Sequence, residues 1–341
     1  MSTPLDPPAV SDVDRPSGFA VGVDVGGTNT KLGFVDPFGV VLAREEVPTK
    51  SLKDPQEACR FFKTFADEQF AKAGGGDGAL SAGVAVPGVL DSNTGRLVYV
   101  ANLPAWCDFP LLDELDRLFA GPVAVCNDAN AAAVAEHSRM NLTDESLALI
   151  TLGTGIGCGV VLRGEPFGGD HGCGFEIGHT PVDFSPEARV CGCGKPGHLE
   201  AYVSVRGVLK SVLQEIDLDG GESPTLKAAR SGEPLAPRHV YEAAAEGDDA
   251  CRRAIARVAR RVGQAAALIC QTLDPHAVLI GGAMTFGGNE SPVGRQFLRD
   301  VQKVVRRYAL DQVADEVFVG FAELGNDAGI CGAAELARTG R

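Results

Sequence analysis

The chain has 341 residues, of which 45% are hydrophobic and 22% are charged, and its formal net charge is −14. This length exceeds what a single compact core usually holds, so we expect two domains or one domain with a large insertion. The strong negative charge argues against a nucleic-acid partner or an anionic membrane surface, because either would repel most of the protein. An anionic small ligand would have to be held by local backbone donors.

The first 18 residues contain prolines and acids but neither the basic nor the apolar segment of a signal peptide, and we expect a flexible tail there. No apolar run reaches the length of a membrane span. Several of the ten cysteines, such as Cys126, Cys158 and Cys270, stand in apolar surroundings, where a reduced thiol packs as a small hydrophobe. These features favour a cytoplasmic location.

Strands and helices alternate along the first part of the chain, which predicts an α/β layer. Its predicted elements are an antiparallel set of strands over 19–25, 30–36 and 39–47, a helix over 55–73, a strand over 81–87, a helix over 111–119, a strand over 122–126 and an alanine-rich helix over 128–140.

The opening pattern recurs near residue 146. VGVDVGGTNTKLGFVD and LALITLGTGIGCGVVLRG each consist of an apolar strand, a tight turn of glycine and threonine, and a second apolar strand, so they form an internal pseudo-repeat. The small residues of the closing helix should let it pack closely. The remaining predicted elements are a helix over 199–214, a loop over 216–238, a helix over 248–273, strands over 277–284 and 316–324, and a helix over 327–337.

The two glycine turns are candidate phosphate-binding sites. Backbone N–H groups can converge on phosphate oxygens where glycine leaves no side chain in the way. Asp24, at the end of the first strand, offers a carboxylate suited to magnesium or its waters, and Lys31 adds positive charge nearby. Tight hairpins without a ligand are the alternative reading. Neither G-x-x-x-x-G-K-[ST] nor a helix-opening G-x-G-x-x-G is present, which excludes an ordinary P-loop or dinucleotide fold.

A series of motifs resembles the ROK family from residue 19 to residue 338. In order, they are DVGGTNTK, VAVPGVLD, ANLPAW, CNDANAAA, LGTGIGCG, EIGHT, CGCGKPGHLE and LIGGAM. The resemblance implies the actin-like ATPase fold shared with hexokinase and Hsp70, an α/β architecture of two ribonuclease-H-like domains around a cleft. It also implies ATP and magnesium as the phosphoryl donor system. The expected parts are the tail over 1–18, a smaller domain over 19–126 plus 322–341, and a larger domain over 127–321.

Asp128 is the candidate catalytic base. It follows an apolar strand and begins a helix, so its carboxylate should lie at the carboxyl end of the strand, where α/β proteins bind ligands. By similarity to the N-D-x-N motif of the family, it would accept the proton of the sugar hydroxyl. A helix N-cap is the alternative role, because aspartate is also favoured there.

The resemblance implies further site residues. Those expected to hold the sugar are Gly88, Asn102, Asn127, Asp128, Glu176, His179 and Glu200. Those expected to hold the nucleotide are Asp24, Gly26, Gly27, Thr28, Asn29, Lys31, Gly153, Thr154, Gly155, Gly281 and Gly282. Amides and carboxylates suit a sugar because each can orient several hydroxyls. Ordinary surface charge is the alternative for the two glutamates.

The stretch CGCGKPGHLE places Cys191 and Cys193 one residue apart in a loop that has little to pack. They cannot easily form a disulfide with each other, so in a reducing compartment they favour a structural zinc ion. His179 and His198 are the nearest candidates for the other two ligands, and His171 is a more distant one. Free cysteines beside an exposed histidine are the alternative.

The chain departs from the family pattern at two positions. The zinc loop of the family resembles C-x-C-G-x-x-G-C, and here His198 replaces the last cysteine, which should keep the site but make it less negative. Phe175 precedes Glu176 where the family usually has glycine, which would alter the local backbone or the sugar pocket. Zinc would tie the loop in place and hold Glu200 and His179 against the sugar.

The resemblance implies ATP-dependent phosphorylation of a hexose at its terminal hydroxyl, most simply by a glucokinase that makes glucose 6-phosphate. An N-acetylhexosamine kinase acting on N-acetylmannosamine or N-acetylglucosamine fits the same motifs, and polyphosphate is an alternative donor. A non-catalytic ROK-type sugar sensor that binds DNA is disfavoured by the acidic charge. An Hsp70-like ATPase would leave the cysteine loop unexplained. A homodimer is expected from the resemblance alone.

Overall fold

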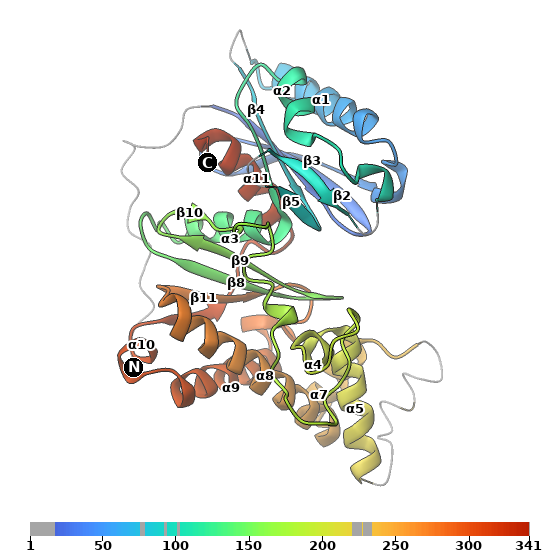
Figure 1. Ribbon diagram of the computed structural model, residues 1–341, viewed down its shortest axis with the longest axis vertical. Coiled ribbons are helices and arrows are strands. Elements are labelled where there is room, and N and C mark those ends of the chain that lie inside the picture. The colour runs from blue at the N-terminus through green and yellow to red at the C-terminus, as the bar shows by residue number, and fades with distance from the viewer. Residues whose placement is uncertain are drawn as a thin grey trace. The chain divides into compact units, whose positions relative to one another are not determined.

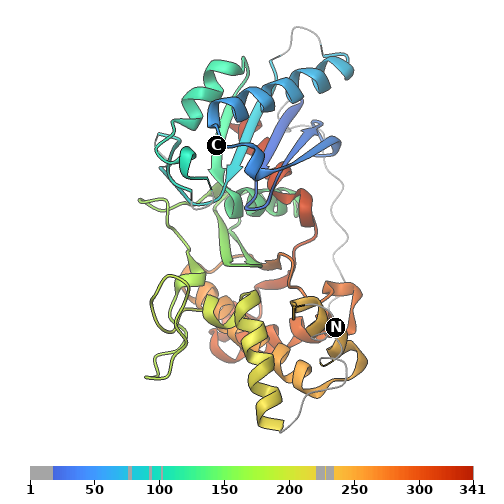
Figure 2. The same cartoon turned by 90° about the vertical axis from the view of Figure 1, so that its right-hand side faces the viewer.

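The computed structural model describes residues 18–75, 79–91, 94–100, 103–219, 227 and 234–340 (Figures 1 and 2). The chain forms two compact units. Unit 1 consists of Met1–Glu145, Gly159–Phe175 and Leu324–Arg341, and unit 2 consists of Ser146–Cys158 and Glu176–Glu323.

The first sheet has five strands in the order β3-β2-β1-β4-β7. β1 is antiparallel to β2 and parallel to β4, and β7 is parallel to β4. The predicted antiparallel start is therefore confirmed, and the two strands that follow it are parallel to β1 and to each other. The strands are β1 (Ala20–Val25), β2 (Asn29–Val35), β3 (Val41–Pro48), β4 (Ser81–Val86) and β7 (Val123–Asn127), and a separate hairpin pairs β5 (Val89–Asp91) with β6 (Arg96–Tyr99).

One face of the first sheet packs against α1 (Pro55–Lys72) and α2 (Leu111–Leu118), as Figure 1 shows. Val23 of β1 and Phe62 of α1 belong to one apolar core with the fully buried Trp106. The indole N–H of Trp106 donates to the backbone oxygen of Leu52 at 2.9 Å, so burial leaves no polar group of this ring unsatisfied.

The opposite face packs against α11 (Ala328–Thr339), which approaches the strands very closely. A Cβ atom at Gly22 of β1 would collide with the backbone oxygen of Ile330, and one at Gly83 of β4 would collide with that of Ala333. Glycine on this face is therefore required by the packing distance between helix and sheet.

α11 also packs against α3 (Asp128–Arg139), the helix that begins with the predicted base. A Cβ atom at Gly332 of α11 would collide with the backbone oxygen of Ala131 in α3. The close packing expected from the small residues of the closing helix is confirmed.

The second sheet has the order β10-β9-β8-β11-β12. β11 runs parallel to β8 and β12, and β10 is antiparallel to β9. This order repeats that of the first sheet, with β8 in the place of β1, which agrees with the pseudo-repeat in the sequence. The strands are β8 (Leu147–Leu152), β9 (Ile156–Leu162), β10 (Glu165–Pro166), β11 (Ala277–Gly281) and β12 (Phe318–Phe321).

In unit 2, α8 packs against β11 and α9 packs against β12 and α8. The described helices of this unit are α4 (Glu200–Val203), α5 (Val205–Asp219), α7 (Pro237–Glu246), α8 (Asp249–Leu273), α9 (Pro292–Tyr308) and α10 (Asp311–Ala314). Single 3₁₀ turns over both units are η1 (Thr49–Ser51), η2 (Pro104–Trp106), η3 (Ile177–His179), η4 (Gly288–Glu290) and η5 (Gly325–Asp327). Over the described ranges, no helix combines the length and the apolar character that a membrane span requires.

Four features of the helices differ from the prediction. α7, α9 and α10 were not predicted, and the predicted helix over 199–214 is interrupted at Ser204. α9 had a readable start, because Ser291 accepts a hydrogen bond from the backbone N–H of Val293 at 3.1 Å and Pro292 occupies the first turn. Its many charged residues hid the apolar positions that pack on the sheet.

The compact units divide the chain differently from the predicted domains. The predicted boundary falls between residues 126 and 127, whereas α3 belongs to unit 1, where it packs against α11. Residues 159–175 also belong to unit 1. Of the predicted tail over 1–18, all but Gly18 lies outside the described residues.

Candidate active site

The turn between β1 and β2 carries the first group of predicted nucleotide-binding residues. The backbone N–H of Gly26 donates to the oxygen of Asn29 at 3.1 Å, and a Cβ atom at Gly26 would lie 2.6 Å from that oxygen. Gly27 and Thr28 are exposed at the tip. The side chain of Lys31 donates to Asn326 at 3.2 Å. The turn therefore presents exposed backbone of the kind that can cradle a phosphate.

Thr49 supports this turn and was missed in the sequence. Its hydroxyl donates to the oxygen of Gly26 at 2.7 Å and lies 3.0 Å from the hydroxyl of Thr30. Its backbone N–H donates to the oxygen of Thr28 at 2.9 Å. Only the pairing of β2 with β3 brings Thr49 here, so no local pattern could have identified it.

Two carboxylates lie near each other at one edge of the first sheet. Asp24 is near the end of β1, and Asp128 directly follows β7, with β4 between the two strands. Burial raises the pKa of Asp24, and Lys31 partly offsets this effect. Burial also raises the pKa of the Cys126 thiol, with both carboxylates adding to the shift. The two acids therefore act on the same thiol, as expected for parallel strands ending at one edge.

Asn127, and not Asp128, is the N-cap of α3. The side-chain oxygen of Asn127 accepts a hydrogen bond from the backbone N–H of Ala129 at 2.9 Å, and Asp128 is the first helical residue. Asp128 also accepts from this N–H, at 2.8 Å. The capping role that was the alternative for Asp128 thus belongs to its neighbour.

The two predicted sugar residues before β7 differ in what the structure describes. Gly88 has φ 97°, a left-handed conformation that favours glycine, and its backbone oxygen accepts from the Asn127 amide at 3.4 Å. Asn102 lies outside the described residues. Gly88 and Asn127 are therefore joined within unit 1.

Phe175 adopts an unusual backbone conformation immediately before Glu176. Its φ is 55°, which is rare for a bulky residue. Its ring packs edge-on against that of Phe167, with the ring centroids 5.8 Å apart. The amide of Asn130 donates to the backbone oxygen of Phe167 at 3.3 Å and accepts from Val160 at 3.0 Å. The departure from the family pattern thus occurs where the backbone itself favours glycine.

In unit 2, the turn between β8 and β9 contains Gly153, Thr154 and Gly155. The backbone N–H of Gly153 donates to the oxygen of Gly155 at 3.0 Å. Glu200 accepts from the backbone N–H of Ile156 at 3.2 Å, and a Cβ atom at Gly155 would lie 2.9 Å from the same carboxylate oxygen. A predicted sugar residue therefore lies against a predicted phosphate turn.

Gly281 and Gly282 lie at the carboxyl end of β11, at the same edge of the second sheet as the turn after β8. Gly281 ends β11, and Gly282 has φ 88°. A Cβ atom at Gly282 would collide with the backbone oxygen of Leu152, the last residue of β8. The glycine turn after β11 is therefore adjacent to the turn after β8, and both are in unit 2.

His179, Cys191, Cys193 and His198 form a cluster whose ligand atoms all lie within 4.8 Å of one another. The sulfur of Cys191 is 3.8 Å from Nδ1 of His179, and that of Cys193 is 3.3 Å from Nδ1 of His198. Tetrahedral zinc with ordinary bond lengths separates sulfur and nitrogen ligands by about 3.6 Å. Both the donor set and the spacing fit zinc, and His171 is not a member of the cluster.

The protonation chemistry of the cluster also suits a cation. Burial lowers the pKa of His198, which favours the neutral imidazole that binds metals. Burial raises the pKa of the Cys191 thiol to about 11. A bound cation would oppose that shift, because it stabilises the thiolate. The thiol of Cys191 donates to Glu200 at 3.4 Å, so the cluster contacts a predicted sugar residue.

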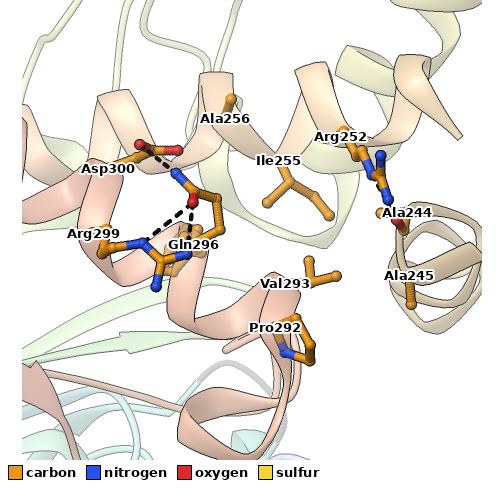
Figure 3. A pocket seen from close by; sticks show the side chains of 11 residues that line it. Ala244, Ala245, Arg252, Ile255, Ala256, Pro292, Val293, Gln296, Arg299 and Asp300 are labelled. Atoms are coloured by element: carbon orange, nitrogen blue, oxygen red, sulfur yellow. Dashed lines mark hydrogen bonds between the residues drawn. The ribbon is translucent and has the colours of Figure 1, made fainter. Parts of the chain in front are cut away.

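A pocket of about 410 Å³ in unit 2 lies away from these residues (Figure 3). Its polar side chains pair with one another: Gln296 donates to Asp300 at 2.9 Å and accepts from Arg299 at 2.7 Å. The lining residues, all on or next to α7, α8 and α9, are Ala244, Ala245, Arg252, Ile255, Ala256, Pro292, Val293, Gln296, Phe297, Arg299 and Asp300. None of them is a predicted site residue.

Comparisons with known proteins agree with the fold and the motifs. The sequence profile of the ROK family matches residues 20–340. A glucokinase of Halalkalibacterium halodurans is 32% identical over 93% of this chain and 94% of its own length. An N-acetylmannosamine kinase of Escherichia coli is 28% identical over 93% and 97%. The crystal structure of a ROK family glucokinase from Streptomyces griseus in complex with glucose and AMPPNP has a TM-score of 0.70, with 29% identity over 94% of this chain and all of that one.

The repeated sheet order and these structural matches define the class: the chain has the actin-like ATPase fold, as predicted. Within that class, it belongs to the ROK family.

Proposed function

We propose that the protein is an ATP-dependent hexose kinase that transfers the γ-phosphoryl group of ATP to the terminal hydroxyl of glucose. The observation that carries this proposal is the pair of carboxylates, Asp24 and Asp128, at one edge of the first sheet. Phosphoryl transfer to an alcohol needs a metal-binding carboxylate and a base, which are the two roles that this pair supports. The glucokinase relatives support glucose as the acceptor.

In the proposed reaction, Asp128 accepts the proton of the attacking hydroxyl. Its position in the first turn of α3 favours negative charge, because the N-terminal end of a helix carries partial positive charge. The contact to the backbone N–H of Ala129 orients one oxygen of the Asp128 carboxylate. Proton removal as the hydroxyl attacks would lower the barrier to transfer.

Asp24 would hold magnesium, directly or through water. Its half-buried carboxylate near exposed turn backbone fits a hard cation, whose bound form would neutralise charge on the phosphates. The turn at Gly26 in unit 1 and the turn at Gly153 in unit 2 are each proposed to contribute backbone N–H groups to phosphate.

The sugar would be held by Asn127, Glu176, His179 and Glu200. In His179, Nδ1 faces the sulfur of Cys191, so Nε2 is the atom proposed to bind a sugar hydroxyl. The bonds of Glu200 to Ile156 and Cys191 support a fixed orientation of its carboxylate. Zinc held by the cluster would supply structural cross-linking and no chemical step.

An N-acetylhexosamine acceptor is the second candidate, favoured by the N-acetylmannosamine kinase relative. The same proposal includes a homodimer and a cytoplasmic location. Polyphosphate is the alternative phosphoryl donor. The acidic charge supports the absence of nucleic-acid and membrane partners.

The test is ADP release from MgATP by the purified protein with glucose, mannose, fructose, N-acetylglucosamine, N-acetylmannosamine or no sugar. We expect release that depends on glucose, with glucose 6-phosphate as the product. Release that depends instead on an N-acetylhexosamine would select the second candidate. ATP binding without any sugar-dependent release would contradict the kinase and favour a sugar sensor.

A further inference from the structure

The loop between His179 and Glu200 is anchored at two separate points. Its two ends pair, since the backbone N–H of Val182 donates to Gly197 at 2.8 Å and that of Leu199 to Thr180 at 3.0 Å. The cysteine and histidine cluster is one anchor point. A group of polar side chains around Tyr202 is the other, and no part of the zinc prediction accounts for it.

Tyr202 lies in α4, two residues after Glu200, and only 9% of it is exposed. Two guanidinium groups lie over its ring: that of Arg189 is 5.0 Å and that of Arg261 is 4.8 Å from the ring centroid. Its hydroxyl donates to the Asp183 carboxylate at 2.8 Å and accepts from the backbone N–H of Arg189 at 2.8 Å. We call Asp183, Arg189, Tyr202 and Arg261 the Tyr202 clamp.

The clamp joins three parts of unit 2. Asp183 and Arg189 belong to the loop, Tyr202 to α4 and Arg261 to α8. Arg189 also donates to the side chain of Gln214 in α5 at 2.6 Å. Arg261 pairs with the Asp183 carboxylate at 3.4 Å. Cation–π contacts and charge-assisted hydrogen bonds of this kind strengthen as water is excluded.

The charge state of the clamp is stable near neutral pH. Hydrogen bonds from the backbone and side chain of Ser185 and from the Tyr202 hydroxyl lower the pKa of Asp183 to about 2. The carboxylate therefore keeps its charge opposite Arg261 without help from a metal. None of the four clamp residues belongs to the metal cluster.

We propose that Tyr202 is a positioning residue for the sugar site, and that the Tyr202 clamp holds the loop and Glu200 in place independently of the metal cluster. Because Glu200 and Tyr202 share the single turn of α4, fixing the ring also fixes the start of that turn. The role of Tyr202 in the sugar site deepens the proposed function and rests on it. The role of the Tyr202 clamp in holding the loop does not depend on that function.

If the two anchors act independently, removing both should loosen the loop far more than removing either one alone. Tyr202→Phe removes the hydroxyl and its two hydrogen bonds but keeps the ring that both arginines contact. With the metal bound, we expect unchanged zinc content and slow amide hydrogen exchange in peptides over 181–199. After chelation, the same peptides should exchange at least about tenfold faster in the variant than in chelated wild-type protein, the size expected for two lost hydrogen bonds.

The matched control is Tyr308→Phe, which removes a hydroxyl from a half-exposed ring that also packs under an arginine, Arg307. It should behave as wild-type protein in both states. Arg261→Gln is a second variant, which removes a clamp residue from α8 without changing the loop. If Tyr202→Phe fails to fold, the same exchange experiment can be carried out with Arg261→Gln.

Equal exchange in chelated Tyr202→Phe and chelated wild-type protein would overturn the clamp. Loss of zinc from Tyr202→Phe before chelation would overturn the independence of the two anchors. Glucose kinetics give a second readout. The KM for glucose should rise more in chelated Tyr202→Phe than in metal-bound Tyr202→Phe or in chelated wild-type protein, and kcat should change less. If the protein phosphorylates no sugar, the exchange arm still decides the loop proposal, so the two failures are distinguishable.

Discussion

At the scale of single residues, Asn127 and Asp128 occupy neighbouring positions at the start of α3. Asn127 caps the helix, and Asp128, the residue proposed as the base, is the first helical residue. The sequence could place both residues at a strand-to-helix junction. It could not decide which of them caps the helix, because both residue types are favoured there.

Asp128→Asn should therefore keep the fold and glucose binding but lower kcat by about 10²- to 10⁴-fold, the usual contribution of a general base. Steady-state kinetics and calorimetric glucose binding measure the two effects. Asp249→Asn is the matched control, because Asp249 holds the same first-turn position in α8 beside an Asp248 cap. Turnover within a few-fold of wild type would exclude Asp128 as the base.

Substitutions at Phe175 would show how much stability this departure from the family pattern gains or loses. Phe175→Gly and Phe175→Ala both remove the contact with Phe167, but only glycine also relieves the left-handed backbone, where an L side chain costs about 1–2 kcal/mol. We expect both variants to be destabilised, with the glycine variant more stable than the alanine variant by about 1 kcal/mol. Urea denaturation measures the difference. An alanine variant as stable as the glycine variant would mean that this backbone is not strained.

At the scale of elements, contact between α11 and its neighbours depends on missing side chains. The small residues of α11 indicated close packing in the sequence, but Gly22 and Gly83 looked like ordinary strand glycines. Only the structure identifies Ile330 and Ala333 as the partners that require them. Helices were predicted well where apolar spacing was regular, as in α1 and α8, and missed where charge dominated, as in α9.

Gly332→Ala should destabilise the protein by about 3 kcal/mol or more, because the new methyl group would meet the backbone of α3 and neither helix can move cheaply. Chemical denaturation of unit 1, followed through Trp106, measures this loss. Gly168→Ala is the control, since a Cβ atom there would have no neighbour within 4 Å. A stability loss as small as that of the control would show that the helices can separate easily.

At the scale of the whole molecule, the main apolar core of unit 1 and the cysteine and histidine cluster of unit 2 belong to different parts of the chain. The main core of unit 1 lies between the first sheet and α1 and α2, whereas the cluster lies in a loop of unit 2. A metal in such a loop should order its surroundings without being needed for the remaining fold.

The purified protein should therefore contain about one zinc per chain, and a strong chelator should remove it while most helical circular dichroism remains. His198→Ala should lower zinc content, and His198→Cys should retain it, because either imidazole or thiolate completes the ligand set. Zinc content is measured by elemental analysis, with the exposed Cys173→Ala as the control. Full zinc content in His198→Ala would show that this histidine is not a ligand.

The sequence by itself determined the family, the α/β class and the repeated strand and turn pattern, and it named the four candidate residues of the cysteine and histidine cluster, with His171 as a further candidate. These properties follow from local motifs, whose order and spacing are visible along the chain. Only the tertiary structure decided that Thr49 supports the first glycine turn and that the guanidinium groups of Arg189 and Arg261 both lie over the ring of Tyr202. Such contacts join residues from different strands, helices and loops, and the chain brings them together only when its apolar faces pack, so no local pattern encodes them.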